Sequence, residues 1–202
     1  RDRSWGTRPV GEQVPLPPTG RPPQVFWLWA PLNFDDVATH LAVFEHADGN
    51  RWMQSGAILP VLPDDDAPTW GGDDGVEHVA GLDHALEWEP GTRRARRATL
   101  TLERRDAEAW SIELEPLTTF RMRGIGYTHP KWGHGRWHGP DEVGSESLVL
   151  DEVDPTDPSS IHIQELVRAR CGDREGVGVL EQLVFGDHEP TGLTGFVDGA
   201  PR

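Results

Sequence analysis

The sequence has a single cysteine, Cys171, among 202 residues. One cysteine excludes an intramolecular disulfide framework and a four-cysteine zinc site, so packing must stabilise the fold. No apolar run approaches about 18 residues, and no charged segment precedes a short apolar one, so the sequence predicts neither a membrane span nor a signal peptide. We therefore expect a cytoplasmic protein.

Basic residues are scarce. The chain has 19 Lys and Arg residues against 34 Asp and Glu residues, and Lys131 is the only lysine. The resulting net charge of −15 repels phosphate backbones and anionic membrane surfaces, so we expect no nucleic-acid partner. The hydrophobic content of 36% is enough to build the core of one large or two small domains.

Helical three-four spacing of apolar residues is also scarce, whereas period-two alternation is common. In Thr99-Leu100-Thr101-Leu102, apolar and polar side chains fall on opposite faces, as a half-buried antiparallel strand requires. Hairpin chemistry occurs at Asp48-Gly49-Asn50 and again at 173–176. We predict an all-β meander that closes, or nearly closes, into a barrel. The predicted strands are 24–30, 37–46, 51–59, 95–103, 110–117, 161–170 and 177–185.

The most informative segment is 124–139, where aromatic rings, glycines and three histidines gather in what would otherwise be a solvated turn. Trp132-Gly133 follows His129 by three residues, just as Trp5-Gly6 follows Asp2, which suggests an internal repeat. The three histidines have the spacing His-x4-His-x3-His, and neutral imidazoles are good metal ligands. No metalloenzyme pattern contains this spacing together with the intervening proline and tryptophan, so we expect no metal or other cofactor.

On these motifs the chain resembles the carotenoid hydratase superfamily, which includes hydroxyneurosporene synthase and the attachment-related lipocalin-like proteins, and above all its actinobacterial branch. The resemblance implies two consecutive lipocalin-like barrels. Residues 1–66 would end the first barrel and residues 76–202 would form the second, so an N-terminal barrel would be missing here, or a homodimer would replace it. The matching motifs are Asp2-Arg3-Ser4-Trp5-Gly6, Gly126-Tyr127-Thr128-His129-Pro130-Lys131-Trp132-Gly133-His134-Gly135 and His188-Glu189-Pro190-Thr191-Gly192-Leu193.

The resemblance also implies a chemistry. In the hydratases a buried acid protonates a carbon–carbon double bond, and water adds to the cation without a cofactor. Asp2 matches the acid, His129 takes its place in the second copy, and Tyr127 would orient the proton donor. The expected function is therefore a hydratase, isomerase or cyclase acting on a terpenoid or lipid-like small molecule. The residues expected to line its site are Trp5, Trp132, His134, Trp137 and His138.

Other interpretations remain open. Asp2 would cap a turn, and the tryptophans would fill barrel ends, in a protein without catalysis. The same cavity would serve a non-catalytic binder of a hydrophobic ligand. Exposed tryptophans would serve a carbohydrate-binding protein, with calcium held in the acidic loops. Glu165 and Glu181 interrupt apolar strands, so each would point inward if the alternation holds, although most such glutamates face solvent. The basic cluster 93–97 enters a strand and predicts protection of a sheet edge.

Overall fold

Nine antiparallel strands form one continuous sheet in the computed structural model, which describes residues 24–62, 64, 66–67, 75–123, 129, 131–132 and 138–200. Within these residues there is no α-helix, and none of the helical turns is long and apolar enough to cross a membrane. The elements are β1 (Val25–Phe34), β2 (Val37–Glu45), β3 (Arg51–Pro60), β4 (Glu77–His78), β5 (Gly81–Trp88), β6 (Ala95–Glu103), β7 (Trp110–Arg121), β8 (Ile163–Cys171), β9 (Arg174–Phe185) and the 3-10 turns η2 (Leu150–Glu152) and η3 (Glu189–Thr191).

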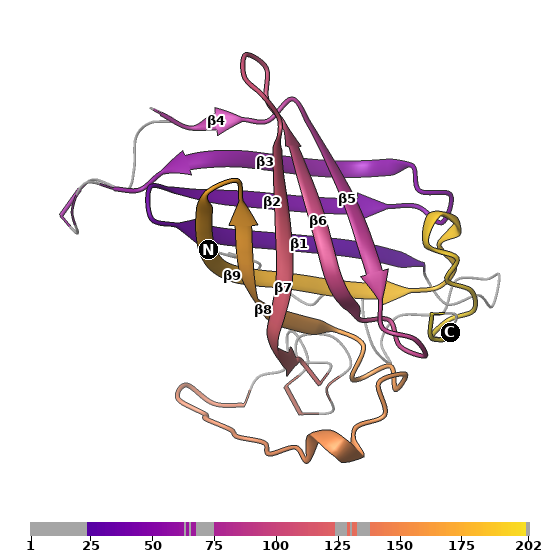
Figure 1. Ribbon diagram of the computed structural model, residues 1–202. Coiled ribbons are helices and arrows are strands. Elements are labelled where there is room, and N and C mark those ends of the chain that lie inside the picture. The colour runs from indigo at the N-terminus through magenta and orange to yellow at the C-terminus, as the bar shows by residue number, and fades with distance from the viewer. Residues whose placement is uncertain are drawn as a thin grey trace.

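The strand order is β4-β3-β2-β1-β9-β8-β7-β6-β5. Neighbours in the sheet are neighbours in sequence except at its centre, where β1 pairs with β9. In Figure 1, β5, β6 and β7 cross steeply in front of the layer that contains β1, β2, β3 and β9. The sheet is thus a curled half-barrel with meander connections, and the all-β, lipocalin-like prediction is confirmed.

The alternating sequence pattern sets which side chains face inward. On β1, Phe26, Leu28 and Ala30 are fully buried, whereas Trp27 and Trp29 between them are only partly buried. The same alternation holds on β6 and β8. Most inward side chains of the long strands pack into a hydrophobic cluster between the two layers, and Phe26 and Leu28 join a second cluster with Val184, Leu193 and Ala200. Cys171 is buried at the end of β8, as a packing role requires.

All seven predicted strands are present, but two strands were missed. β5 alternates regularly from Leu82 to Trp88 but has no β-branched residue, and β4 has only two residues. The first hairpin turn is at the predicted place, where Gly49 has a φ of 81°. The second turn lies earlier than predicted. Cys171 pairs with Arg174, so the turn is Gly172-Asp173, and the rest of the predicted turn belongs to β9.

The predicted role of the basic cluster 93–97 is wrong. β6 lies between β5 and β7 and is not a sheet edge. Arg93 is only 3% exposed, and its guanidinium donates hydrogen bonds to the carbonyl oxygens of Gly186, Thr194, Gly195 and Asp198 at 2.7–3.0 Å. Arg93 therefore anchors the C-terminal segment on the sheet.

Strands from both predicted units, 1–66 and 76–202, belong to the same sheet. β1 pairs with β9 from Val25–Phe185 to Phe34–Gly176, and the buried side chains of the two strands share one core. Among the described residues, the sheet therefore continues across the predicted boundary. The boundary itself coincides with the connection between β3 and β4.

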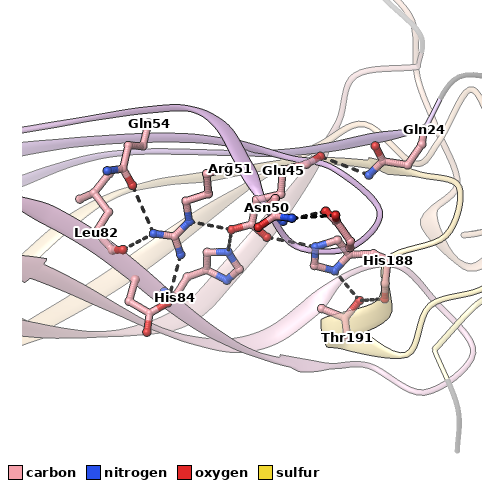
Figure 2. A network of polar contacts seen from close by, with 11 residues as sticks. Gln24, Glu45, Asn50, Arg51, Gln54, Leu82, His84, His188 and Thr191 are labelled. Atoms are coloured by element: carbon pink, nitrogen blue, oxygen red, sulfur yellow. Dashed lines mark hydrogen bonds and ion pairs between the residues drawn. The ribbon is translucent and has the colours of Figure 1, made fainter.

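The two ends of the sheet meet where β3 lies against β5, and a buried carboxylate closes this seam (Figure 2). Glu45 of β2 is only 4% exposed. Its Oε1 accepts hydrogen bonds from Arg51 Nε at 2.9 Å and lies 2.8 Å from Nε2 of His84 on β5. Arg51 also donates hydrogen bonds to the carbonyl oxygen of Leu82 and to Oδ1 of Asp83. The distance to Asp83 Oδ1 is 3.1 Å. Side chains thus join two strands that share no hydrogen-bond ladder.

The same carboxylate holds the segment before η3. Glu45 Oε2 lies 3.0 Å from Nε2 of His188, which is fully buried and stacks on Phe26 with 3.9 Å between ring centroids. Burial opposes ionisation of Glu45, but hydrogen bonds from His188, His84 and Arg51 outweigh it and hold the pKa of this carboxyl far below its usual range. We call Glu45, Arg51, His84 and His188 the seam cluster.

Candidate ligand site

A groove of about 530 Å³ lies outside the hydrophobic core, between the end of β7 and the segment 142–148 that leads toward η2. Figure 1 shows this segment in orange, beyond the end of β7. The volume falls within the range of small-molecule sites. Carbon-rich side chains form much of the wall. The described lining residues are Phe120, Arg121, Arg123, Trp132, Glu142, Val143, Gly144, Ser145, Glu146 and Leu148.

A β-bulge directs Phe120 to this groove. Leu114 faces inward, so strict alternation along β7 would also place residue 120 inward. The register with β8 instead shifts between Pro116 and Thr118, where Leu117 is the extra residue. Pro116 has no N–H to donate to a ladder, which is consistent with a bulge at this point. As a result Thr119 faces the interior and Phe120 is 56% exposed.

His129 is buried at one end of the groove and has a fixed hydrogen-bond pattern. Its Nδ1 accepts hydrogen bonds from the backbone N–H groups of Lys131 at 3.1 Å and Trp132 at 2.8 Å. Because Nδ1 accepts, the ring proton is on Nε2, which donates to Glu146 Oε1 at 2.9 Å. The ring therefore joins the turn 131–132 to the segment 142–148.

Trp132 forms the wall next to His129. Gly144 lies so close to the ring that a Cβ atom there would be 2.1 Å from Cζ2 of Trp132. The Lys131 ammonium lies 4.5 Å from the centroid of the same ring and 3.0 Å from Glu142 Oε1. His138 packs edge-on against the ring at 4.9 Å between centroids. Trp132 is thus held on several sides by residues that lie on or beside the groove.

Two arginines lie at the end of β7. Arg121 donates to the carbonyl oxygen of Ser160 at 3.1 Å, and burial, together with nearby Arg94, lowers its pKa. Arg123 has a φ of 52°, and it alone among the described non-glycine residues has a positive φ. Its Nε is buried and makes no hydrogen bond. The groove therefore combines apolar walls with an arginine that has a strained backbone and a buried Nε without a hydrogen-bond partner.

A family model described as "Family of unknown function (DUF8625)" matches residues 1–194. The chain belongs to this family. Comparisons with curated proteins and with solved structures found no match. The family description assigns no activity, so the function has to be argued from the site.

Of the site residues predicted from the sequence, Trp132 lines the groove, and His129 and His138 contact it from behind the wall. His129 and Trp132 lie next to each other, and His138 contacts both the Trp132 ring and the carbonyl oxygen of Lys131. The other predicted site residues lie outside the described residues. These are Asp2 and Tyr127, predicted as catalytic, and Trp5, His134 and Trp137, predicted as ligand-binding.

Several residues of the groove were not predicted. Phe120 depends on the bulge, for which Pro116 is the only signal in the sequence. Arg123 lies beyond the predicted end of its strand, although the Arg-x-Arg spacing with Arg121 was visible. Glu146 lies in a segment that has no regular secondary structure and no recognisable motif, so its contact with His129 has no sequence signal.

A second candidate acid is inside the sheet. Glu165 is fully buried between Ile163 and Val167, where its carboxylate contacts Thr119 Oγ1 at 3.0 Å and Arg94 Nη1 at 3.1 Å. Burial raises the pKa of Glu165, and Arg94 and Thr119 only partly oppose this effect. Glu165 is absent from the groove wall. Of the two orientations that the sequence left open for Glu165, the structure has the inward one.

The outward face of β1, β2 and β3 carries an aromatic stack. Phe44 lies between Trp27 and Trp52, with ring centroids 4.3 and 4.5 Å away, and Trp52 is 56% exposed. Trp27 Nε1 donates to Glu181 Oε1 at 2.9 Å. Within the described part of the chain, no group of three or more His, Cys, Asp or Glu side chains is arranged to hold a metal ion.

Proposed function

We propose that this protein binds a hydrophobic small molecule in the groove formed by the end of β7, Trp132 and the segment 142–148. The observation that carries the proposal is the groove itself, a volume of about 530 Å³ whose wall includes Phe120, Trp132, Val143 and Leu148. Phe120 and Val143 are 56% and 88% exposed, and large apolar side chains gathered in a concave site are typical of ligand binding.

The interior of the half-barrel supports the same choice of site. Sixteen buried residues from both layers pack together there, and interiors of this kind have few voids larger than a water molecule. A ligand inside the sheet would displace buried leucines such as Leu100 and Leu114. The groove offers apolar contact without that cost.

The test is a titration with N-phenyl-1-naphthylamine, a neutral apolar dye that fluoresces strongly when it leaves water. We expect saturable binding to the wild-type protein and at least a tenfold weaker affinity in Trp132→Ala, which removes the aromatic wall. Trp52→Ala is the matched control, because it deletes the same side chain from the aromatic stack, which does not line the groove. Equal affinities in the wild type and Trp132→Ala would remove the groove as the site, and weaker binding in Trp52→Ala would favour the aromatic stack.

An acid–base enzyme acting in the same groove is the second candidate. The pairing of His129 with Glu146 favours it, because a carboxylate that accepts the ring proton can orient an imidazole for proton transfer. The geometry limits the direction of transfer. Nδ1 of His129 accepts two backbone hydrogen bonds, so the neutral ring can receive a proton only by breaking them. Protonation of a double bond would then depend on another acid, for which Asp2 is the candidate from the sequence.

The binding function and the acid–base enzyme predict different effects of the substitutions Asp2→Asn and Glu146→Gln. Both substitutions preserve size, and Glu146→Gln keeps an oxygen that can accept the hydrogen bond from His129. If the protein is an enzyme, these variants will bind the dye normally but will not incorporate labelled oxygen when acyclic terpenoid alkenes are incubated in oxygen-18 water. If the wild type incorporates no label, the binding function is favoured.

A further inference from the structure

We infer that the ligand of the groove is an amphiphile with a single anionic head group, and that Arg123 receives this group. The inference rests on the proposed function and adds the chemical class of the ligand. Four charged residues line the groove, namely Arg121, Arg123, Glu142 and Glu146. These four groups differ in whether they already have partners within the chain.

Both carboxylates are neutralised or hydrogen-bonded by residues of the same loop. Glu142 lies 3.0 Å from the ammonium of Lys131, and Glu146 accepts the Nε2 proton of His129 at 2.9 Å. Of the two guanidinium groups, Arg121 donates to the Ser160 carbonyl oxygen and lies in the field of the buried Glu165. The remaining charge belongs to Arg123, which makes no ion pair or hydrogen bond in the described part of the chain.

The conformation and surroundings of Arg123 are energetically unfavourable. A positive φ of 52° is unfavourable for a side chain with a Cβ atom, and glycine or asparagine would adopt it more easily. A buried guanidinium nitrogen that lacks a hydrogen-bond acceptor is also unfavourable. Strain and an unsatisfied donor at the same residue, in the wall of a groove, indicate that an acceptor arrives from outside the chain.

The acceptor that suits this donor is an oxyanion. Guanidinium groups bind carboxylates and phosphates through two parallel hydrogen bonds, and these charge-assisted bonds are roughly twice as strong as neutral ones. The net charge of −15 repels anions in general, so a local cation is required to hold one. An apolar tail would lie along Phe120, Trp132 and Val143. A medium-chain fatty acid has both parts.

The test compares decanoate with 1-decanol by isothermal titration calorimetry at pH 7.5. These probes share the same tail and differ in the head group, and decyl phosphate tests whether the site distinguishes a carboxylate from a phosphate. We expect the wild type to bind decanoate roughly tenfold to a hundredfold more tightly than decanol, the range that charge-assisted hydrogen bonds provide. If decyl phosphate binds more tightly than decanoate, the ligand is still an anionic amphiphile, but its head group is a phosphate and not a carboxylate.

In Arg123→Gln, we expect the preference for decanoate to disappear while the affinity for decanol stays unchanged. Arg105→Gln is the matched control, because it removes the same charge from the exposed β6–β7 turn and should keep the preference. Arg123→Gly provides a variant whose folding is not in doubt, since glycine adopts a positive φ without strain. It should lose the preference as well and have a higher melting temperature.

The outcomes separate this inference from the proposed function. If the wild type binds decanoate and decanol equally, the anionic head group is refuted and the apolar groove stands. If neither probe binds, the proposed function fails. If the preference persists in both Arg123 variants, another cation receives the head group, and the assignment to Arg123 is overturned.

Discussion

Replacing Glu45 with glutamine should destabilise the protein strongly, because this one carboxylate joins β2, β3, β5 and the segment before η3. Glu45 is 4% exposed and lies within 3.0 Å of nitrogen atoms of Arg51, His84 and His188. Removing one partner of a buried ion pair costs about 3–5 kcal/mol, because the remaining charges are left without compensation. Arg51 is 24% exposed, so hydration of its guanidinium offsets part of the lost interaction energy. We therefore expect the free energy of unfolding to fall by about 3 kcal/mol.

The effect should depend on pH in a defined direction. The folded protein lowers the pKa of Glu45, so the unfolded chain takes up the proton first as the pH falls. The stabilisation by Glu45 is therefore complete above the ordinary glutamate pKa of about 4.3 and decreases at lower pH. The difference between the wild type and Glu45→Gln should be largest near pH 7 and should shrink as the pH falls from about 5 towards 3.

Urea denaturation followed by tryptophan fluorescence, repeated across this pH range, measures the free energy of unfolding directly. In thermal unfolding at pH 7, the melting temperature of Glu45→Gln should be about 6–12 °C below that of the wild type. About 1 kcal/mol corresponds to about 2–4 °C for a chain of this size. Glu115→Gln is the control, because Glu115 forms an exposed pair with Arg168 at 3.3 Å and should change stability by less than about 0.5 kcal/mol. A destabilisation in Glu45→Gln that is small, or that stays constant down to pH 3, would refute the role of the seam cluster.

Two further predictions concern the C-terminal segment and the groove wall. Arg93→Lys should lower the free energy of unfolding by about 2–4 kcal/mol, because one ammonium cannot reach the four carbonyl oxygens that the guanidinium binds. Denaturation with urea tests this, and limited proteolysis should cut the segment 186–200 first. Gly144→Ala should weaken binding of N-phenyl-1-naphthylamine several-fold, since the new methyl group would overlap the Trp132 ring and no charge changes. An unchanged dye affinity would show that this contact does not shape the site.

The sequence was sufficient to predict the strands whose pattern is set by burial. β1, β6 and β8 place side chains alternately in the core and outside it, and period-two alternation is the direct consequence of that geometry. β5 was missed although Leu82, Leu86 and Trp88 keep the period-two pattern, because the strand has no β-branched residue and a histidine occupies one of its inward positions. The pairing of β1 with β9 joins residues about 150 positions apart, and no local pattern encodes it.

The site was predicted less completely, for related reasons. His129 and Trp132 were selected as candidates because histidine and tryptophan are unusual in a glycine-rich turn. Glu146 was missed because its role depends on a contact with His129 across 17 residues of chain without regular structure. Arg93 was misassigned because a run of arginines is usually solvated, and only the folded C-terminal segment supplies the carbonyl oxygens that bury it.

The bulge at Leu117 links the fold to the groove. Beyond Pro116 the bulge reverses which side chains of β7 point inward and which point outward. Thr119 turns inward and donates a hydrogen bond to the buried Glu165, while Phe120 turns outward into the groove. Without the bulge Phe120 would face Glu165, which would lose a hydrogen-bond donor, and the groove would lose an aromatic wall. The stability of the interior and the shape of the ligand site therefore depend on the same irregularity, so a substitution that restores regular pairing at this point should impair both.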